Sequence, residues 1–254
     1  MSYYGGYAPY VSVAEKREKA KKSIDKLKKK DPNISPVIIT GRTLAVTWWG
    51  KSWNKNLESY SDYSNRIERG RSYVRNSAVL DLKIIQGNIV ALVQGSETKP
   101  YKVNITINSL QKTVWEDITK ECVGKIESLQ ELVEGKFPKA LSDFFTVKGK
   151  GLFPTPKEIN LSCNCPDYAN MCKHVAAVLY GVGVRLDENP ALFFVLRNIN
   201  IEELISETIN KKSQTMLEKS KTKSSRVIEE TDISDMFGID LDDGIKNISK
   251  KKRT

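Results

Sequence analysis

The stretch NLSCNCPDYANMCKHV, residues 160–175, contains three of the chain's four cysteines and its single histidine. These side chains form two pairs with the same spacing, Cys163-x-Cys165 and Cys172-x-His174. Thiolates and a neutral imidazole are the ligands that tetrahedral Zn²⁺ takes in closed structural sites. In a reducing compartment, clustered cysteines are metal ligands more often than disulfides. The pattern therefore predicts one structural zinc ion bound by Cys163, Cys165, Cys172 and His174.

Other uses of this cluster fit the residues poorly. The Cys-x-x-Cys redox motif is absent, and a disulfide between Cys163 and Cys165 would close a strained small ring. A catalytic cysteine needs a histidine from elsewhere in the chain, and there is no second histidine. Zinc deaminases keep a water-open site with a glutamate beside the histidine, which this stretch lacks. The sequence therefore predicts a closed site and a protein that is not an enzyme.

The residues around the cluster indicate its local structure. The preceding segment EINL has the composition of a strand, so Cys163 and Cys165 are expected to flank a tight turn at its end. After Cys172, apolar residues recur at helical spacing, which places His174 in the first turn of a helix. Three thiolates and one imidazole around Zn²⁺ carry a net charge of −1, which a helix N-terminus stabilises.

The region before the cluster predicts an α+β fold. Four runs, RTLAVTWW, SAVLDLKII, NIVALVQG and YKVNITI, have strand character, and the turn-like QGN and GSETKP indicate an antiparallel meander. Apolar residues from Leu110 to Val133 then recur every three or four positions, which predicts one long helix. Cys122 lies on that apolar stripe and is expected to be a buried core thiol. We expect a small antiparallel sheet with a long helix, plus a ββα-like zinc module.

Charge and arginine content suggest a polyanionic partner. The chain has 41 Lys and Arg against 31 Asp and Glu, a formal charge of +10, which favours nucleic acid. Four arginines lie close together in SNRIERGRSYVRN, beside Tyr73, whose ring offers a stacking face. The alternative for this segment is an exposed loop whose charges form salt bridges. The predicted nucleic-acid contacts are Arg66, Arg69, Arg71, Arg75, Lys148, Lys150 and Lys173.

The tryptophans in the segment TWWGKSW admit two interpretations. Trp48, Trp49 and Trp53 are expected to be core or packing residues, and the alternative is a stacking platform for bases.

The composition divides the chain into four segments. Residues 1–36 form a basic N-terminal arm with a charged helix over residues 11–30, either a polyanion contact or a solvated helix. Residues 37–150 form the α+β domain, and residues 151–200 the zinc finger with a following helix. Residues 201–254 form a largely disordered charged tail. Within the tail, apolar residues among acidic ones predict a partner-binding segment, namely Ile233, Met236, Phe237, Ile239 and Leu241.

The two one-residue spacings, set between a strand and an apolar helix, resemble the SWIM zinc finger. The upstream segments TWWGKSW and GRSYVRNSAVLDLKIIQGNIVALVQGSETKPYKVNI also look like the region before the finger in prokaryotic SWIM proteins. Such proteins are often encoded beside Swi/Snf-type DNA-dependent ATPases. The resemblance covers most of residues 40–200. It implies zinc ligation by Cys163, Cys165, Cys172 and His174, DNA binding or protein interaction, and no enzymatic activity.

These observations predict a non-catalytic accessory protein that binds zinc and DNA, or assists a Swi/Snf-type ATPase in chromatin, repair or recombination. The alternative is an adaptor that binds another protein subunit and makes no direct contact with nucleic acid. No apolar run approaches the roughly 20 residues of a membrane span, and the N-terminus lacks the features of a secretory signal. We therefore expect an intracellular protein, cytoplasmic or nucleoid-associated, with no membrane partner and no small-molecule substrate.

Overall fold

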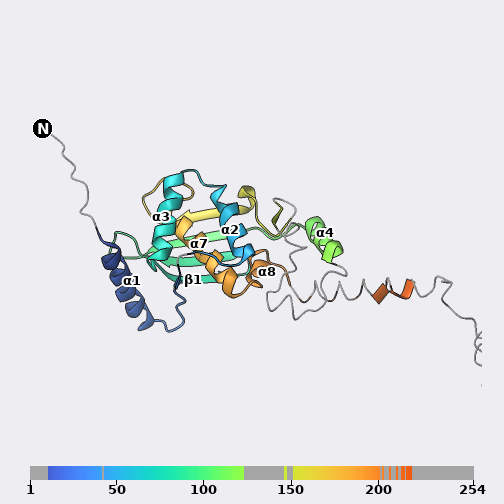
Figure 1. The fold of residues 1–254 in the computed structure, drawn as a ribbon, viewed down its shortest axis with the longest axis horizontal. Helices are drawn as coiled ribbons and strands as arrows, with labels where there is room; N and C mark the ends of the chain where they lie inside the picture. Colours follow the sequence, from blue (N-terminus) through green and yellow to red (C-terminus); the bar gives the residue numbers. More distant parts are fainter. Residues whose placement is uncertain are drawn as a thin grey trace, which may run out of the picture. The chain divides into compact units, whose positions relative to one another are not determined.

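The computed structural model describes residues 11–41, 43–122, 146–147 and 151–200, with scattered positions between 202 and 218. Residues up to Asn210 cluster as one compact unit, and residues 211–254 form a second one. In the first unit, helices precede, follow and cover one antiparallel sheet (Figure 1). The elements are α1 (Val13–Lys28), α2 (Trp48–Glu58), α3 (Ser64–Arg75), β1 (Val79–Ile85), β2 (Asn88–Val93), β3 (Tyr101–Ile107), α4 (Lys112–Cys122), β4 (Ile159–Cys163), α7 (Lys173–Glu188) and α8 (Leu192–Leu196).

The sheet has four strands in the order β1-β2-β3-β4, all antiparallel. Its first three strands are consecutive in sequence, whereas β4 comes from the segment just before the cysteine cluster and pairs with β3. Because side chains alternate along a strand, Ile159, Leu161 and Cys163 of β4 share one face. That face is the one whose residues on β2 and β3 are buried. Cys163 therefore points towards the main core.

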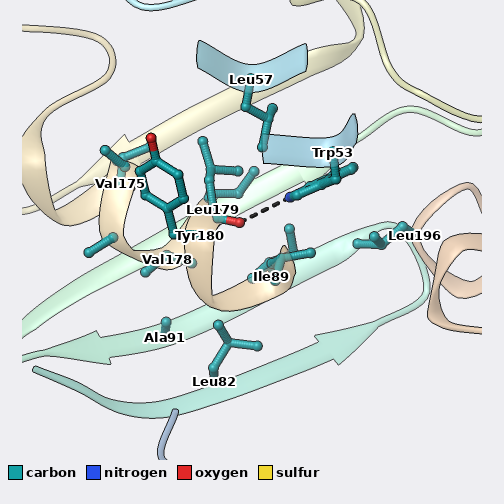
Figure 2. Close-up of a cluster of buried hydrophobic side chains, with 14 of the residues drawn as sticks. Trp53, Leu57, Leu82, Ile89, Ala91, Val175, Val178, Leu179, Tyr180 and Leu196 are labelled. Carbon is teal, nitrogen blue, oxygen red and sulfur yellow. Dashed lines mark hydrogen bonds between the residues drawn. The ribbon is translucent and has the colours of Figure 1, made fainter. Parts of the chain in front are cut away.

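Helix α7 lies along this face of the sheet and forms the centre of the core. Figure 2 shows Val178 of α7 above Ala91 of β2, whereas Leu179 lies on the side of Leu57 of α2. Eleven of the sixteen residues of α7 are buried. A helix that is apolar nearly all round has to be covered on more than one side. Here the sheet covers one side of α7, and α2 and α3 cover another.

Helices α2 and α3 pack against α7 on the side away from the sheet (Figure 1). Trp53 of α2 is 1% exposed, and its indole N–H donates to the backbone oxygen of Leu179 at 3.0 Å (Figure 2). On α3, a Cβ added to Gly70 would lie 2.5 Å from Cβ of Ala176 on α7. Contacts this short are not tolerated between real side chains. Glycine at position 70 therefore permits the close approach of α3 to α7.

Helix α1 covers the opposite face of the sheet. Its buried residues Ala20 and Ile24 form a second, smaller apolar cluster with Leu80 of β1, and Leu92 of β2 packs against it. A register irregularity between Val79 and Asp81 accompanies this change of face along β1. The charged helix predicted over residues 11–30 is thus present. Its apolar face, although narrow, is docked on the sheet rather than solvated all round.

The α+β class, the small antiparallel sheet and the zinc-finger module are confirmed, but one predicted strand is wrong, and so is the loop given as the alternative for the arginine segment. RTLAVTWW is not a strand, because α2 begins at Trp48, with Thr47 as its N-cap. The Thr47 hydroxyl accepts from Gly50 N at 3.1 Å, and the Asp187 carboxylate accepts from the backbone N–H groups of Val46 and Thr47. These donors are satisfied without a neighbouring strand. The arginine segment, whose alternative reading was an exposed loop, is helix α3.

The predicted long helix begins close to where the pattern placed it. Helix α4 starts at Lys112, and its stripe residue Ile118 is 2% exposed. Residues 123–145, which include the rest of the predicted helix, lie outside the described residues, as does the side chain of Cys122. The prediction that Cys122 is a core thiol therefore stays a prediction. The expected helix after the finger is α8.

The close packing of α3 on α7 can be tested with Gly70→Val. The added side chain meets Ala176, so we expect the free energy of unfolding to fall by about 2 kcal/mol, as for other overpacked cores. The matched control is Gly41→Val, because nothing lies within 4 Å of a Cβ at Gly41. Urea titration followed by circular dichroism measures both. Equal midpoints for the two variants would contradict the packing at the α3–α7 crossing.

Candidate metal centre

The four predicted ligands come from two elements that meet at one end of the core. Cys163 ends β4, Cys165 follows a one-residue turn, Cys172 is the N-cap of α7, and His174 lies in its first turn. The turn is held to β3, because Lys102 N donates to the Asn164 side-chain oxygen at 2.8 Å and Asn164 N donates to the Lys102 carbonyl at 3.3 Å. The predicted strand, turn and helix start are therefore all present.

The ligand atoms converge as a zinc site requires. The three Sγ atoms and a ring nitrogen of His174 all lie within 4.8 Å of one another. Cys163 Sγ is 3.8 Å from His174 Nδ1. A tetrahedral site with Zn–S bonds of about 2.3 Å places its sulfur atoms about 3.8 Å apart. The arrangement thus fits one structural zinc ion with four protein ligands, and a fourth protein ligand leaves no open position for a substrate.

His174 is held by aromatic rings rather than by hydrogen bonds. Its ring is 1% exposed, stacks on Tyr101 with centroids 4.3 Å apart, and meets the edge of Tyr73 at 5.4 Å. With Nδ1 towards the thiols, Nε2 is buried and has no hydrogen-bond partner in the described part of the chain. Metal-bound histidines more often donate this N–H to an oxygen. Here the two tyrosine rings take over the task of orienting the imidazole.

Gly95 completes the packing around His174. A Cβ at this position would lie 2.3 Å from the ring of Tyr101 and 3.1 Å from His174 Nε2. Any larger residue would therefore displace the ring that stacks on the histidine.

The thiols share protons unequally before metal binds. The pKa of Cys172 is lowered to about 4, because the Cys163 thiol donates to it, and contacts with His174 and Val175 N outweigh its burial. The same hydrogen bond, with burial, raises the pKa of Cys163, and burial raises that of Cys165. Cys172 is thus the first thiolate that this end of α7 offers to a metal. Zn²⁺ would deprotonate the other two on binding.

The loop between the two ligand pairs is fixed from α3 and from the turn before it. Arg66 of α3 contacts both oxygens of the Asp167 carboxylate, at 2.8 and 3.1 Å, and this pair is mostly buried. Burial opposes ionisation of Asp167, but the hydrogen bonds from Arg66 and Ala169 N prevail and lower its pKa. The Asp62 carboxylate accepts from Asn170 N at 2.9 Å. The loop is therefore held at several points besides the predicted zinc ligands.

The structure separates the predicted nucleic-acid contacts into two groups. Arg66 is engaged by Asp167, and Arg71 pairs with Glu58 at 2.7 Å while donating to the Tyr180 hydroxyl at 2.8 Å. Arg69 and Arg75 are exposed on α3, and no ion pair within the described residues engages either. The salt-bridge interpretation thus describes one half of the arginine set and leaves the other half at the surface.

The remaining predicted contact and packing residues are less uniform. Lys173 is half-buried at the start of α7, where its charge acts on Asp167. Lys148 and Lys150 lie outside the described residues, as do all five predicted partner-binding residues of the tail. As predicted for the three tryptophans, Trp53 is a core residue, and Trp48 and Trp49 are half-buried and pack against the core.

Sequence reasoning missed several contacts of the site, and it named Tyr73 only as a stacking face for a nucleic acid. Tyr73 and Tyr101 pack on His174, Gly95 makes room for them, and Asp62 and Asp167 hold the loop. Tyr101 begins β3 and lies 73 residues before His174. No local pattern in the sequence could therefore indicate that the two rings are in contact. Of these residues, the sequence could have suggested Asp167, because it is an acidic residue between Cys165 and Cys172 in a chain that also has an arginine-rich segment.

Comparison with known proteins identifies the kind of site. Residues 145–182 match the sequence model of the SWIM zinc finger, so the chain contains a SWIM zinc finger. With the Cys3His cluster, this match supports zinc binding by Cys163, Cys165, Cys172 and His174.

A relative from Mycobacterium tuberculosis, "Uncharacterized protein Rv2102", is 36% identical over 168 residues, which is 66% of this chain and 60% of the relative. The chain thus matches less than two thirds of that relative's length. No solved structure matches this chain.

The zinc site can be tested by removing one ligand. Cys163→Ser is expected to purify without stoichiometric zinc and to melt about 10 °C lower, the shift that a loss of about 3 to 4 kcal/mol produces in a chain of this size. Elemental analysis gives the zinc content, and differential scanning calorimetry gives the Tm. The control is Cys122→Ser, which removes the cysteine outside the cluster and should keep one zinc per chain. Full zinc content in Cys163→Ser would contradict the assignment.

The loop anchor can be tested with Asp167→Asn. Without the carboxylate charge, Arg66 loses its ion pair, so the loop between Cys165 and Cys172 should move more freely and zinc should leave faster. A chromogenic chelator in excess measures the rate of zinc release. The matched control is Asp117→Asn, an exposed carboxylate of α4 that is far from the finger in sequence and whose ion pair within the described residues is with Lys120. Equal release rates in the two variants would show that the ion pair does not hold the loop.

Proposed function

We propose that this chain is a non-catalytic zinc-binding accessory protein that binds DNA and assists a Swi/Snf-type DNA-dependent ATPase in chromatin, repair or recombination. The observation that carries the DNA-binding part is the distribution of exposed cations on two helices. Arg69 and Arg75 of α3 have no ion-pair partner in the described residues, and α1, whose Arg17 reaches the backbone of Arg75, carries seven basic and three acidic residues. Exposed arginine side chains beside a basic helix suit the phosphates of a nucleic acid.

The zinc site supports a structural role rather than a catalytic one. All four positions of a tetrahedral ion have a protein ligand, so water or substrate has no place on the metal. The finger's helix α7 is buried in the core rather than displayed at the surface. In the proposed mechanism, zinc fixes the end of α7 and the loop before it, while cations on α1 and α3 contact phosphates. No helix in the described part of the chain is long and apolar enough to cross a membrane, and we place the protein in the cytoplasm or on the nucleoid.

A salt titration of DNA binding tests this function. The zinc-loaded full chain is titrated into fluorescein-labelled duplex and single-stranded oligonucleotides, and fluorescence anisotropy reports binding. With about four phosphates contacted, affinity for the duplex should fall about a hundredfold between about 50 and 200 mM salt. Absence of binding to both oligonucleotides at low salt would overturn the DNA-binding function. It would favour the adaptor, in which the chain binds another protein alone.

The ATPase part of the proposal has a separate test. The full chain, immobilised through its N-terminus, should retain a Swi/Snf-type ATPase from native extract treated with nuclease. The same chain with Phe237→Glu and Leu241→Glu should not, because the proposed contact is apolar. Capture of the ATPase by both forms would move the contact away from the tail. Capture by neither would remove the ATPase from the proposal.

A further inference from the structure

The two outer edges of the sheet differ in how they are protected. Along β1, residues 35–37 close the edge, because Val37 N donates to the Val79 carbonyl at 3.0 Å and Leu82 N donates to the Ser35 carbonyl at 2.9 Å. A register irregularity also interrupts β1. Natural proteins cover or interrupt edge strands in these ways to prevent pairing with other chains. The β1 edge is therefore closed to a further strand.

The opposite edge, formed by β4, has none of these protections within the described residues. Strand β4, yellow in Figure 1, is the last strand of the sheet, and no described segment pairs with its outer side. Its sequence INLSC contains no charged residue and no proline, and its register with β3 is regular. An edge of this kind is a template on which another extended chain can pair.

The backbone groups of β4 alternate between its two sides. Asn108 N donates to the Glu158 carbonyl at 2.9 Å, and Asn164 N donates to the Lys102 carbonyl at 3.3 Å. In an antiparallel pair, every second residue directs both backbone groups to its neighbour. The even-numbered residues of this segment therefore face β3, and the odd-numbered ones direct their N–H and C=O groups outwards.

Leu161, at the middle of β4, keeps both of its outward backbone groups available. The N–H of Ile159, the first residue of the strand, donates to the Pro156 carbonyl. By contrast, no hydrogen bond within the described part of the chain engages the N–H or the C=O of Leu161. The centre of the β4 edge thus offers one donor and one acceptor to an incoming strand.

A groove of 250 Å³ lies beside this edge, and we refer to it as the β4 groove. Leu161, Met171 and Leu179 supply apolar lining, and Asp62 and Asn170 supply polar lining. The volume is below the roughly 300 to 1,000 Å³ of small-molecule sites. It therefore suits a side chain or two rather than a cofactor.

The metal centre fixes both walls of the β4 groove. Cys163 is the last residue of β4, and Met171 directly precedes Cys172, the N-cap of α7. On the outer rim, Asp62 accepts from Asn170 N at 2.9 Å and so holds the finger loop in place. A peptide would therefore meet walls that are already ordered and would lose little affinity to their ordering.

The pleat of the sheet determines where the side chains of an added strand would point. Residues directly opposite each other in an antiparallel pair share one face of the sheet. A residue paired with Leu161 would exchange two hydrogen bonds with it and direct its own side chain into the β4 groove. Its two neighbours would point to the other face, where Asn160 and Ser162 are exposed. The edge thus suits a peptide with an apolar residue between two polar ones.

The charge at the rim indicates the chemistry of the partner. The exposed Asp62 carboxylate has no ion pair within the described residues, so it favours a lysine or arginine and disfavours the phosphates of a nucleic acid. A second copy of this chain fits less well. A two-fold contact along β4 would bring both Asp62 carboxylates to the same side of the shared edge.

We propose that the outer edge of β4 binds an extended segment of a partner protein as an additional strand, with an apolar side chain in the β4 groove and a basic residue near Asp62. Backbone hydrogen bonds supply affinity in this mode of recognition, and the groove supplies specificity. The contact uses none of the cations of α1 and α3. It therefore stands or falls independently of the DNA-binding function.

Amide hydrogen exchange of the zinc-loaded full chain, followed by NMR, tests whether the edge is open. The Leu161 N–H faces outwards and should exchange quickly, whereas the Ser162 N–H faces β3 and should exchange about a hundredfold more slowly. Slow exchange at Leu161 in the free chain would show that the edge is already covered and would overturn the proposal.

A phage-displayed library of random peptides of about nine residues, long enough to span β4, is the probe for the partner. Peptides selected on the zinc-loaded full chain are synthesised with a fluorescein label, and anisotropy reports their affinity. They should alternate apolar and polar residues, include a lysine or arginine, and slow the exchange of the Leu161 N–H. N-methylation of the residue that pairs with Leu161 should weaken binding about tenfold, and N-methylation of its neighbour should change little.

Two variants of the full chain test the groove and its charge. Asn170→Trp places a large ring at an exposed position of the β4 groove and should weaken peptide binding about tenfold. The matched control is Asn65→Trp, at an exposed asparagine of α3 that does not line the groove. Asp62→Asn keeps an oxygen for Asn170 N but removes the charge, so binding should weaken about threefold and lose its salt dependence. Zinc content and Tm are measured for each variant, so that loss of folding is recognised.

Each remaining outcome contradicts the proposal in a different way. Selected peptides that leave Leu161 exchange unchanged and bind Asn170→Trp normally would place the peptide site elsewhere. Equal effects of N-methylation at the paired residue and at its neighbour would exclude strand addition. Protection of Leu161 that rises with chain concentration in the absence of peptide would make the occupant a second copy of this chain. A library that yields no binding peptide would also overturn the proposal, and all of these results leave the DNA-binding function to its own test.

Discussion

The structure depends on one buried helix whose two ends are fixed by polar groups. Helix α7 lies between the sheet on one side and α2 and α3 on another, so its position sets the place of nearly every other element. At its start, Cys172 and His174 belong to the zinc cluster, which joins the helix to the end of β4. At its end, Asp187 accepts from the backbone of Val46 and Thr47 and so fixes the start of α2. Apolar burial drives the assembly, and these two polar ends set its register.

Zinc substitutes for apolar burial in the finger loop. Between Cys163 and Cys172 the chain buries only Ala169 and Met171, too little to order the segment by itself. Metal ligation supplies the missing free energy, because a structural site that does not exist in the unfolded chain contributes its binding energy to folding. Arg66 and Asp62 then hold the loop against α3 and the turn before it. The ion is coupled to the sheet through Cys163 and to the core through His174, so its effect reaches beyond the finger.

Sequence reasoning succeeded where the determining interactions are local. The zinc ligands, the helix start at Cys172 and strands β1 to β3 follow from spacing and alternation within a few residues. It failed for α2, because Trp48, Trp49 and Thr47 have high strand propensity. The usable signal was Trp49 and Trp53 at helical spacing, both donating to backbone oxygens of α7. The partner of Arg66 is 101 residues away, and no local pattern could show that this arginine is already engaged.

Net charge alone is therefore a poor guide to where an anion binds. Of the four arginines that the sequence groups together, α3 turns Arg66 and Arg71 towards internal carboxylates and leaves Arg69 and Arg75 at the surface. The helical period produces this division, since Arg66 points towards the finger loop and Arg71 points towards α2. Docking of α1 then brings Arg17 beside Arg75 and closes a cleft between α1 and α3 against Tyr73. The same tyrosine supports His174, so one ring lies between this cleft and the metal centre.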